Sequence, residues 1–158
     1  MDAYIYQSGD WPQFSLSWDG YYFKDGDQYE AITGGWSSDG WSSYSGCTIV
    51  IEDVLSILTP DAAYSGYIST VNAIDLTDVN TIWFDSPNGK NGKMYGGYLG
   101  LYTEKGNYGS LVKEESIYTT GTGSIDVSEL SGPHYIAFRA IGGATNSAYA
   151  DIRAIWKE

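Results

Sequence analysis

The pattern that decides the fold is HYIAFRAI at residues 134–141, followed after a glycine-rich turn by AYADIRAIW at residues 148–156. In the first run, Ile136, Phe138 and Ala140 fall on one face. The second run places five residues on one face: Ala148, Ala150, Ile152, Ala154 and Trp156. A period of two indicates β-strands, because successive side chains of a strand point to opposite faces. We therefore predict a long antiparallel hairpin over 134–156.

Short apolar runs of the same kind occur along the rest of the chain. The expected strands are 47–52, 67–74, 81–85, 97–103, 111–113 and 123–127, and 21–27 reads as an aromatic strand ending in Gly-Asp. Turn residues rich in Gly, Asn and Pro separate them. Residues 52–58 are the best helical candidate, but this segment is short. The sequence thus predicts an all-β protein, a two-sheet antiparallel sandwich of the jelly-roll type.

Two corners of the chain repeat one pattern. They read IDLTDVN at 74–80 and IDVSELS at 125–131. Asp and Ser or Thr side chains suit a tight corner because they hydrogen-bond nearby backbone amides. We expect both segments to be structural corners of the sandwich, each ending in an apolar residue that packs inward.

Length and charge narrow the domain organisation and the partners. The chain has 158 residues, which suits one domain. We predict a lead-in or edge strand over 1–20 and a sandwich domain over 21–158. The net charge of −12 argues against nucleic acid and anionic membranes as partners, because both are negatively charged. The start of the chain also lacks the basic and apolar stretches of a signal peptide.

Three segments carry a resemblance to a known family: YFKDGDQYEAITGGW at 22–36, SGYISTVNAIDLT at 65–77 and the corner at 125–136. Together they resemble a β-sandwich domain, similar to the galactose-binding-like jelly roll, of phage and prophage tail and structural proteins from Gram-positive bacteria. The resemblance implies a non-catalytic module that displays a surface for a bacterial surface glycan. It also implies other virion or assembly proteins as partners and a virion or extracellular location. It carries over no fixed ligand-binding residues.

Aromatic residues supply the strongest functional signal. They make up 16% of the chain, with 15 Tyr and 6 Trp. A flat aromatic face stacks on the C–H face of a sugar and offers a large contact area at low conformational cost. Trp36, Trp41 and Tyr44 cluster in a loop rich in Gly, Ser and Asp, so we predict that they bind glycan. The alternative is that these rings anchor the loop on the core.

A second aromatic group lies in the expected strand at 97–103. Tyr98 and Tyr102 share one strand face, with Gly100 between them, and a strand glycine permits the close approach of a ligand or another part of the chain. We predict ligand binding at Tyr98 and Tyr102, with cross-strand aromatic packing as the alternative. Trp11 and Trp18 suit an interdomain or subunit contact.

Metal-ligating patterns are weak. Residues 25–27 and 85–88 supply oxygen ligands of the kind that Ca²⁺ binds, but the full acidic loop pattern is absent. One cysteine, Cys47, and one histidine, His134, do not supply the ligands of a zinc site. We predict no metal site and no cofactor, and Ca²⁺ is the one ion that stays a candidate.

Catalytic signatures are missing as well. The sequence holds no Gly-x-Ser-x-Gly elbow and no phosphate-binding Gly-Lys-Ser/Thr loop. Glu114 and Glu115 are the only adjacent glutamates, and neighbours on a strand point apart, so they would not flank one glycosidic bond. We predict a carbohydrate-binding or receptor-binding module and not an enzyme. The alternatives are a structural interaction domain of a phage particle and a carbohydrate-active enzyme or its fragment.

Overall fold

The computed structural model describes residues 20–26, 34–42, 46–60, 65–87, 97–117, 121–142 and 149–158. This part of the chain forms strands and one short 3-10 helix, η1 (Tyr108–Ser110), so the all-β prediction is confirmed. The strands are β1 (Tyr21–Lys24), β2 (Trp36–Ser37), β3 (Thr48–Ile51), β4 (Leu55–Leu58), β5 (Ser65–Thr70), β6 (Ile74–Asp75), β7 (Thr81–Ser86), β8 (Gly97–Tyr102), β9 (Leu111–Ile117), β10 (Gly121–Asp126), β11 (Pro133–Ile141), β12 (Tyr149–Ile152) and β13 (Ala154–Lys157). Within these residues, no helix has the length and apolar character that crossing a membrane requires.

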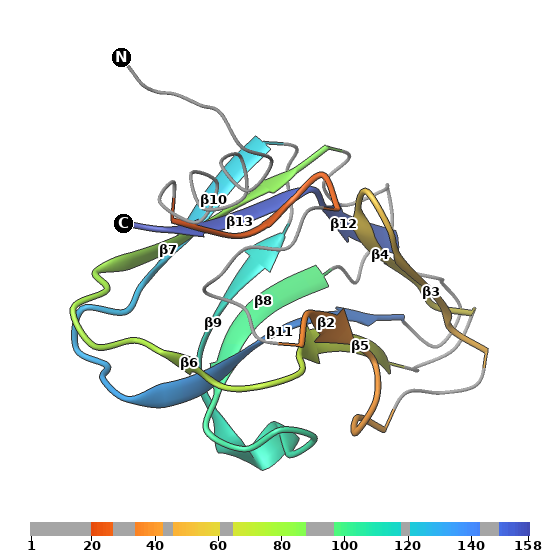
Figure 1. Ribbon diagram of the computed structural model, residues 1–158. Coiled ribbons are helices and arrows are strands. Elements are labelled where there is room, and N and C mark those ends of the chain that lie inside the picture. Colours follow the sequence, from red (N-terminus) through yellow and green to blue (C-terminus); the bar gives the residue numbers. More distant parts are fainter. Residues whose placement is uncertain are drawn as a thin grey trace, which may run out of the picture.

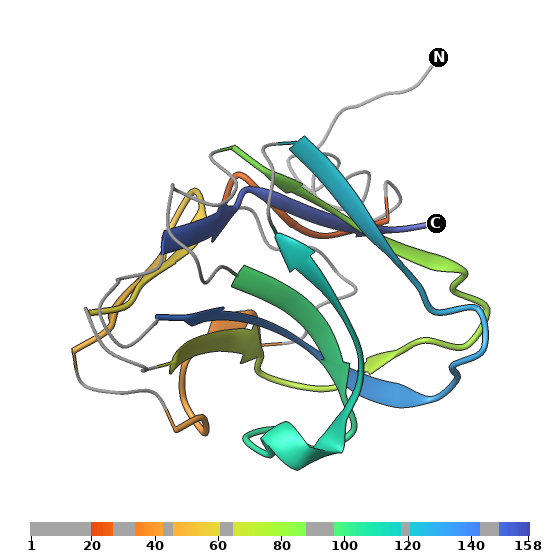
Figure 2. The ribbon, with the colours of Figure 1, turned by 180° about the vertical axis from the view of Figure 1, so that it is seen from behind.

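The strands form three antiparallel sheets. The first sheet has the order β1-β13-β7-β10, and the second has the order β2-β5-β11-β8-β9, with β6 paired to the start of β11. The third sheet has the order β12-β4-β3. The first and second sheets lie as two layers, and the third closes one side of the molecule (Figures 1 and 2). This arrangement confirms the predicted antiparallel sandwich.

The core lies between the two layers. The second sheet contributes Ile68, Leu99, Leu101, Ile136 and Phe138, and the first contributes Phe23, Ile82, Phe84, Ile125 and Ile155. The alternation predicted for β11 is confirmed, since Ile136, Phe138 and Ala140 all join this core. The side chains between these positions point outward, so each layer has an outer face on which a site can be built.

The predicted hairpin over 134–156 is wrong. β11 pairs with β5 and β8 in the second sheet, whereas β13 pairs with β1 and β7 in the first. Both runs carry an apolar face directed at the core. The two runs bury these apolar faces from opposite layers. They face each other across the core and are not neighbours in one sheet.

The helical candidate at 52–58 is also a strand for part of its length. It contains β4, in which Leu55 and Ile57 have no exposed surface. These two side chains sit at alternate positions and both pack into the core. The period of two therefore describes the segment better than a helical period does.

The two corners form as predicted and connect the two layers. Asp75 accepts a hydrogen bond from the backbone N–H of Thr77 at 2.9 Å, and Asp126 accepts one from the N–H of Ser128 at 2.9 Å. The bonds from Thr77 lower the pKa of Asp75, and the hydroxyl and amide of Ser128 lower the pKa of Asp126. The first corner leads from β6 to β7 and the second from β10 to β11.

Candidate functional site

Trp41 and Tyr102, both predicted to bind a ligand, lie on the outer face of the second sheet and are buried there. The Trp41 ring stacks on Tyr67 with centroids 4.7 Å apart and planes 10° apart, and Tyr102 meets it edge-on at 5.0 Å. Trp41 also donates a hydrogen bond from Nε1 to Ser69 Oγ at 2.7 Å. Trp41 is 9% exposed and Tyr102 is 0% exposed. Trp41 thus anchors its loop, and neither ring has a face open for stacking on a sugar.

Trp36 lies on the other side of the same sheet. It packs against the core between the layers, edge-on to Phe23 at 6.1 Å, and donates a hydrogen bond from Nε1 to the carbonyl of Tyr22 at 3.2 Å. Tyr44 lies outside the described residues. Trp36 and Trp41 turn to opposite sides of the second sheet, so they do not form the shared platform that we predicted. The alternative, loop anchoring, describes both.

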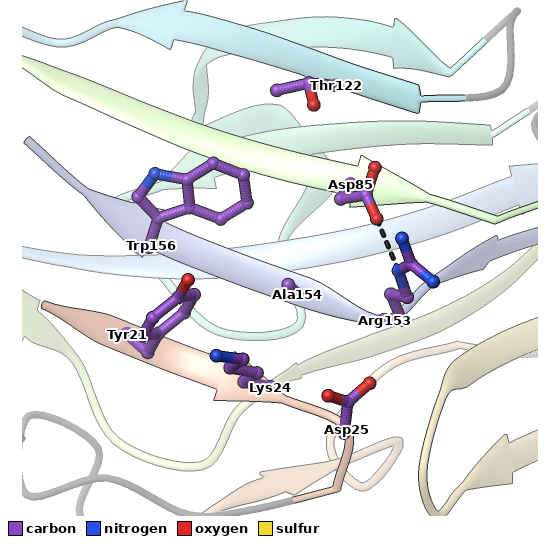
Figure 3. Close-up of a pocket in the computed structure, with 8 residues that line it drawn as sticks. All are labelled: Tyr21, Lys24, Asp25, Asp85, Thr122, Arg153, Ala154 and Trp156. Carbon is purple, nitrogen blue, oxygen red and sulfur yellow. Dashed lines mark hydrogen bonds and ion pairs between the residues drawn. The ribbon is translucent and has the colours of Figure 1, made fainter. Parts of the chain in front are cut away.

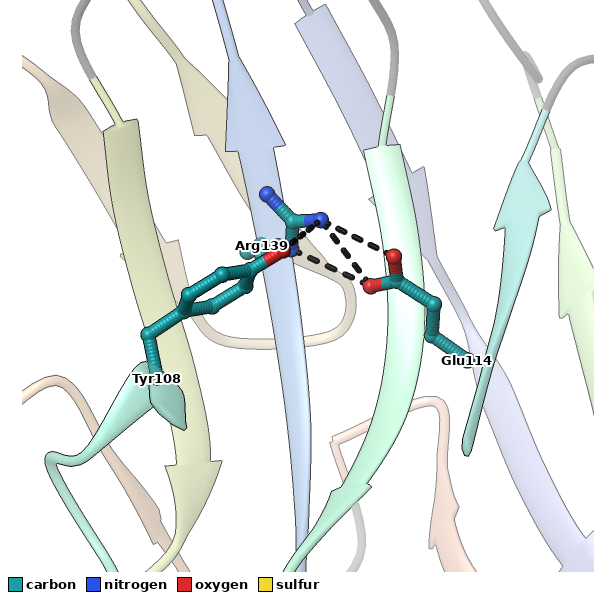
Figure 4. A network of polar contacts seen from close by, with 3 residues as sticks. All are labelled: Tyr108, Glu114 and Arg139. Atoms are coloured by element: carbon teal, nitrogen blue, oxygen red, sulfur yellow. Dashed lines mark hydrogen bonds and ion pairs between the residues drawn. The ribbon is translucent and has the colours of Figure 1, made fainter. Parts of the chain in front are cut away.

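Tyr98 is part of a network around Arg139 of β11. The guanidinium carbon lies 4.5 Å from the ring centre of Tyr98 and 4.8 Å from that of Tyr108. Glu114 of β9 accepts hydrogen bonds from Arg139 Nε and Nη2, the shortest 2.9 Å, and lies across the guanidinium from Tyr108 (Figure 4). Burial opposes the charged form of Arg139, but the hydrogen bonds and charge of Glu114 outweigh it and raise the pKa.

Gly100 lets this surface close on itself. A Cβ at Gly100 would lie 2.9 Å from Leu111 Cδ1 and 3.1 Å from the Tyr102 ring. The close approach that we predicted here is therefore made by the protein's own side chains. We call this outer face of the second sheet the closed face, defined by Trp41, Tyr67, Tyr98, Tyr102, Tyr108, Glu114 and Arg139.

The outer face of the first sheet carries a row of three aromatic side chains. Tyr21 of β1 stands opposite Trp156 of β13, which stands opposite Trp83 of β7. The ring centroids are 5.7 Å and 6.3 Å apart along the row, and the planes of the two indoles differ by 12°. Viewed onto the sheet, the Trp156 indole is seen face on (Figure 3). The ring of Trp83 is close to parallel with that of Trp156, so the row presents two neighbouring indoles of similar orientation.

A hollow lies beside this row. A second row runs in register through Lys24, Ala154, Asp85 and Thr122, two residues along β13 and β7 and three along the bulged β1. The small side chain of Ala154 forms the floor, and the hollow has a volume of about 410 Å³. This volume lies within the range of roughly 300–1,000 Å³ that is usual for small-molecule pockets. We call the aromatic row and the hollow together the open face.

Charged groups surround the hollow. Arg153 donates a hydrogen bond from Nε to the Asp85 carboxylate, while its terminal nitrogens make no hydrogen bond within the described part of the chain (Figure 3). Lys24 Nζ lies 4.7 Å from the ring centre of Tyr21. Asp25, an exposed residue with φ of 50°, completes the wall. The positive charges of Lys24 and Arg153 balance the negative charges of Asp25 and Asp85.

The metal hypothesis rested partly on Asp25 and Asp85, and both carboxylates line this hollow. Arg153 is paired to Asp85, which places a positive charge where a cation would bind. The described residues contain no group of three or more His, Cys, Asp or Glu side chains arranged to hold a metal ion. Asp27 and Asn88 fall in segments that the structure does not describe.

Two strand irregularities build the open face, and sequence alternation did not reveal them. In β1 the register shifts between Tyr21 and Phe23, so Tyr22 and Phe23 are both buried while Tyr21 and Lys24 point outward. A bulge of this kind re-aims side chains that strict alternation would place elsewhere.

The second irregularity lies at Arg153, between β12 and β13. The backbone N–H of Arg153 bonds to the carbonyl of Asp85 at 3.0 Å, and its own carbonyl accepts from the N–H of Asp25 at 2.9 Å. The break turns Ile155 into the core and Trp156 outward. Our alternation had placed Trp156 on the same face as the core residues of this run. The outward direction of Trp83 could have been predicted from sequence, because Trp83 alternates with buried neighbours in β7.

Similarity to known proteins is found among solved structures. No protein-family model matches the sequence, and no curated protein matches it. Among solved structures, the chain is similar to a low affinity xylan binding module, CBM86, from the xylanolytic gut symbiont Roseburia intestinalis. The TM-score is 0.48 and the identity 11%, over 79% of this chain and 96% of that chain. A likeness at this level does not assign a ligand to this chain.

Proposed function

We propose that this protein is a non-catalytic carbohydrate-binding module whose site is the open face. The observation that carries the proposal is the pair of parallel indoles, Trp83 and Trp156, beside a hollow lined with hydrogen-bonding groups. An apolar surface with a few placed polar groups is the usual composition of a small-ligand site.

The aromatic row and the hollow supply complementary contacts. The flat faces of Trp156 and Trp83 fit the C–H face of a sugar ring, which burial removes from water. The terminal nitrogens of Arg153 donate hydrogen bonds and the carboxylate of Asp25 accepts them, so hydroxyl groups find both kinds of partner. Stacking supports affinity, and the polar wall fixes orientation.

The charge distribution favours a neutral glycan. Around the hollow, Lys24 and Arg153 balance Asp25 and Asp85, which leaves no net positive charge to attract an acidic sugar. The whole chain carries −12, so an acidic polysaccharide would be repelled at long range.

A glycan array that includes plant and bacterial wall polysaccharides tests this proposal, with the affinity for each hit then measured by calorimetry. Trp156→Ala should weaken binding roughly 10- to 100-fold, the effect of truncating a central aromatic anchor. Tyr108→Ala is the matched control, since Tyr108 is 49% exposed but lies on the closed face. Equal affinity for wild type and Trp156→Ala would refute the open face as the site.

A finer placement follows only from the resemblance to phage and prophage sandwich domains. It puts the module in a tail or other virion protein, with a bacterial surface glycan and assembly proteins as its partners. That placement stays a prediction. Silence of the wild-type protein across the array, at concentrations high enough for weak binders, would favour a purely structural role in such an assembly.

A further inference from the structure

Two of the three rings in the aromatic row share one orientation, and the third does not. The planes of Trp83 and Trp156 differ by 12°, and their ring centroids are 6.3 Å apart. Tyr21 is tilted by 52° from Trp156, and Lys24 Nζ lies 4.7 Å from the Tyr21 ring centre (Figure 3). Tyr21 thus has its own partners and lines the hollow together with Trp156. The stacking surface consists of the two indoles, both half-buried.

Two parallel indoles restrict the shape of the glycan that stacks on both. A sugar makes most contact with an aromatic ring when the two planes are parallel. Neighbouring sugars on Trp156 and Trp83 must therefore lie nearly parallel to each other as well. A β-1,4 linkage holds successive sugar rings nearly parallel in an extended ribbon. By contrast, β-1,3 and α-1,4 linkages turn successive rings against each other and coil the chain.

We propose that the open face selects an extended, ribbon-like β-1,4-linked polysaccharide, and that Glu158 is the positioning residue that sets this selectivity through Trp83. The inference rests on the proposed function. The polysaccharide crosses from β13 to β7, with neighbouring sugars on Trp156 and Trp83. Trp156 itself lines the hollow, so the sugar on Trp156 has the polar groups of the hollow beside it.

Glu158 fixes the orientation of Trp83 through a hydrogen bond. Its Oε1 atom accepts from Trp83 Nε1 at 2.6 Å. The backbone of Glu158 is itself held, because its N–H bonds to the carbonyl of Thr81 at 2.9 Å and its carbonyl accepts from the N–H groups of Asn80 and Thr81 at 2.9 and 3.1 Å. The indole is thereby tied at its nitrogen as well as at its Cα. An aromatic ring ordered before the ligand arrives loses less conformational entropy on binding.

The test compares three linear hexamers of glucose that differ only in linkage: cellohexaose (β-1,4), laminarihexaose (β-1,3) and maltohexaose (α-1,4). Each is titrated by calorimetry. Wild type should bind cellohexaose about tenfold more tightly than the other two, the effect of one added stacking contact. Trp83→Ala should remove this preference by weakening cellohexaose alone, because a coiled chain stacks only on Trp156. Trp156→Ala should weaken the binding of all three probes.

Glu158 is tested by two variants and by a spectrum taken without glycan. Glu158→Ala should lower the preference for cellohexaose to about threefold or less, because Trp83 is no longer ordered. Glu158→Gln keeps an acceptor oxygen and should retain the preference. Two indoles this close couple electronically, so near-UV circular dichroism carries a signal that Trp83→Phe and Trp156→Phe both remove. Glu158→Ala should alter that signal and Glu158→Gln should preserve it.

The outcomes separate this inference from the proposed function. If Trp156→Ala weakens every probe but wild type binds the three hexamers equally, the glycan site stands and the linkage selectivity is wrong. A preference for cellohexaose that survives Trp83→Ala also overturns the inference. An unchanged preference and spectrum in Glu158→Ala would remove Glu158 from it. If wild type binds none of the hexamers, the inference falls, and the array decides whether glycan binding falls with it.

Discussion

Each outer face of the sandwich carries an arginine paired with a carboxylate beside aromatic rings, but the two pairs differ in exposure. On the closed face, the side chains of Arg139 and Glu114 are 6% and 25% exposed. On the open face, those of Arg153 and Asp85 are 55% and 16% exposed. The guanidinium carbon of Arg139 lies 4.5 Å and 4.8 Å from the ring centres of Tyr98 and Tyr108. The terminal nitrogens of Arg153 make no hydrogen bond within the described part of the chain.

The same residue types serve stability on one face, and we propose that they serve recognition on the other. Removing one partner of a buried pair leaves an unpaired charge out of water, which costs far more than losing an exposed pair. On the closed face, Trp41 and Arg139 both have partners within the protein: Trp41 stacks on Tyr67, and Arg139 donates hydrogen bonds to Glu114. On the open face, the terminal nitrogens of Arg153 make no hydrogen bond within the described residues, and the indoles of Trp83 and Trp156 form the surface that we propose for glycan.

The largest expected effect separates the two tryptophan environments. Trp41→Ala should lower the free energy of unfolding by about 3–5 kcal/mol, because it removes a buried ring and leaves a cavity. Trp156→Ala should cost about 1 kcal/mol or less, since its ring is half-buried on the surface. Urea unfolding of both variants measures this. Equal losses would show that the two faces do not differ in the way described.

The ion pairs give the next contrast. Glu114→Ala should lower the free energy of unfolding by about 3 kcal/mol, because Arg139 stays buried without its partner. Asp85→Ala should cost at most about 1 kcal/mol, since Arg153 can turn to water. The measurement is again urea unfolding at low salt.

A double variant sharpens this second comparison. Replacing the closed-face pair with apolar side chains, Arg139→Met with Glu114→Leu, should recover much of the loss seen for Glu114→Ala, because no buried charge remains. If the double variant is less stable than the single one, the network contributes through its specific geometry and the explanation by unpaired charge is wrong.

The smallest effect concerns acid, and it should arise at the corners and not on either face. The lowered pKa of Asp75 and Asp126 means that each stabilises the folded state above its ordinary pKa of 3.8 and loses that contribution as the pH falls through the folded value. The double variant Asp75→Asn with Asp126→Asn keeps acceptor oxygens but cannot titrate. Its unfolding free energy should therefore fall less steeply below about pH 4 than that of wild type.

If the unfolding free energies of wild type and this variant fall in parallel as the pH is lowered, Asp75 and Asp126 are not the source of the acid sensitivity. At neutral pH the two proteins should differ little, because an amide oxygen can accept the same corner hydrogen bonds. A large difference there would instead mean that the carboxylate charge itself holds the corner together.

Local patterns were sufficient for much of the fold. Alternation at 134–141 placed Ile136 and Phe138 in the core, and the Asp-Thr and Asp-Ser corners formed as expected. Local patterns did not predict which strands pair with each other. An apolar strand face is equally satisfied by either layer, so the pattern at 148–156 did not tell which sheet the strand joins.

Local patterns did not predict the open face, for a related reason. Its aromatic row joins three strands that are distant in sequence, and it depends on a bulge after Tyr21 and a break at Arg153. Neither irregularity leaves a turn residue such as Gly or Pro to mark it. The glycine-rich loop around Trp36 and Trp41 looked more like a platform because its aromatic residues are close in sequence, although they pack on opposite sides of one sheet.

The aromatic row takes its central ring from β13 and one flanking ring from β1, the last and first strands that the structure describes. During synthesis on a ribosome, Tyr21 and Trp83 would emerge well before Trp156, and domains acquire their structure as the chain grows. The surface that we assign to glycan therefore cannot exist until residue 156 has left the ribosome. Retention on a glycan resin would then report that a chain has been made through β13, and chains terminated before Trp156 would pass through.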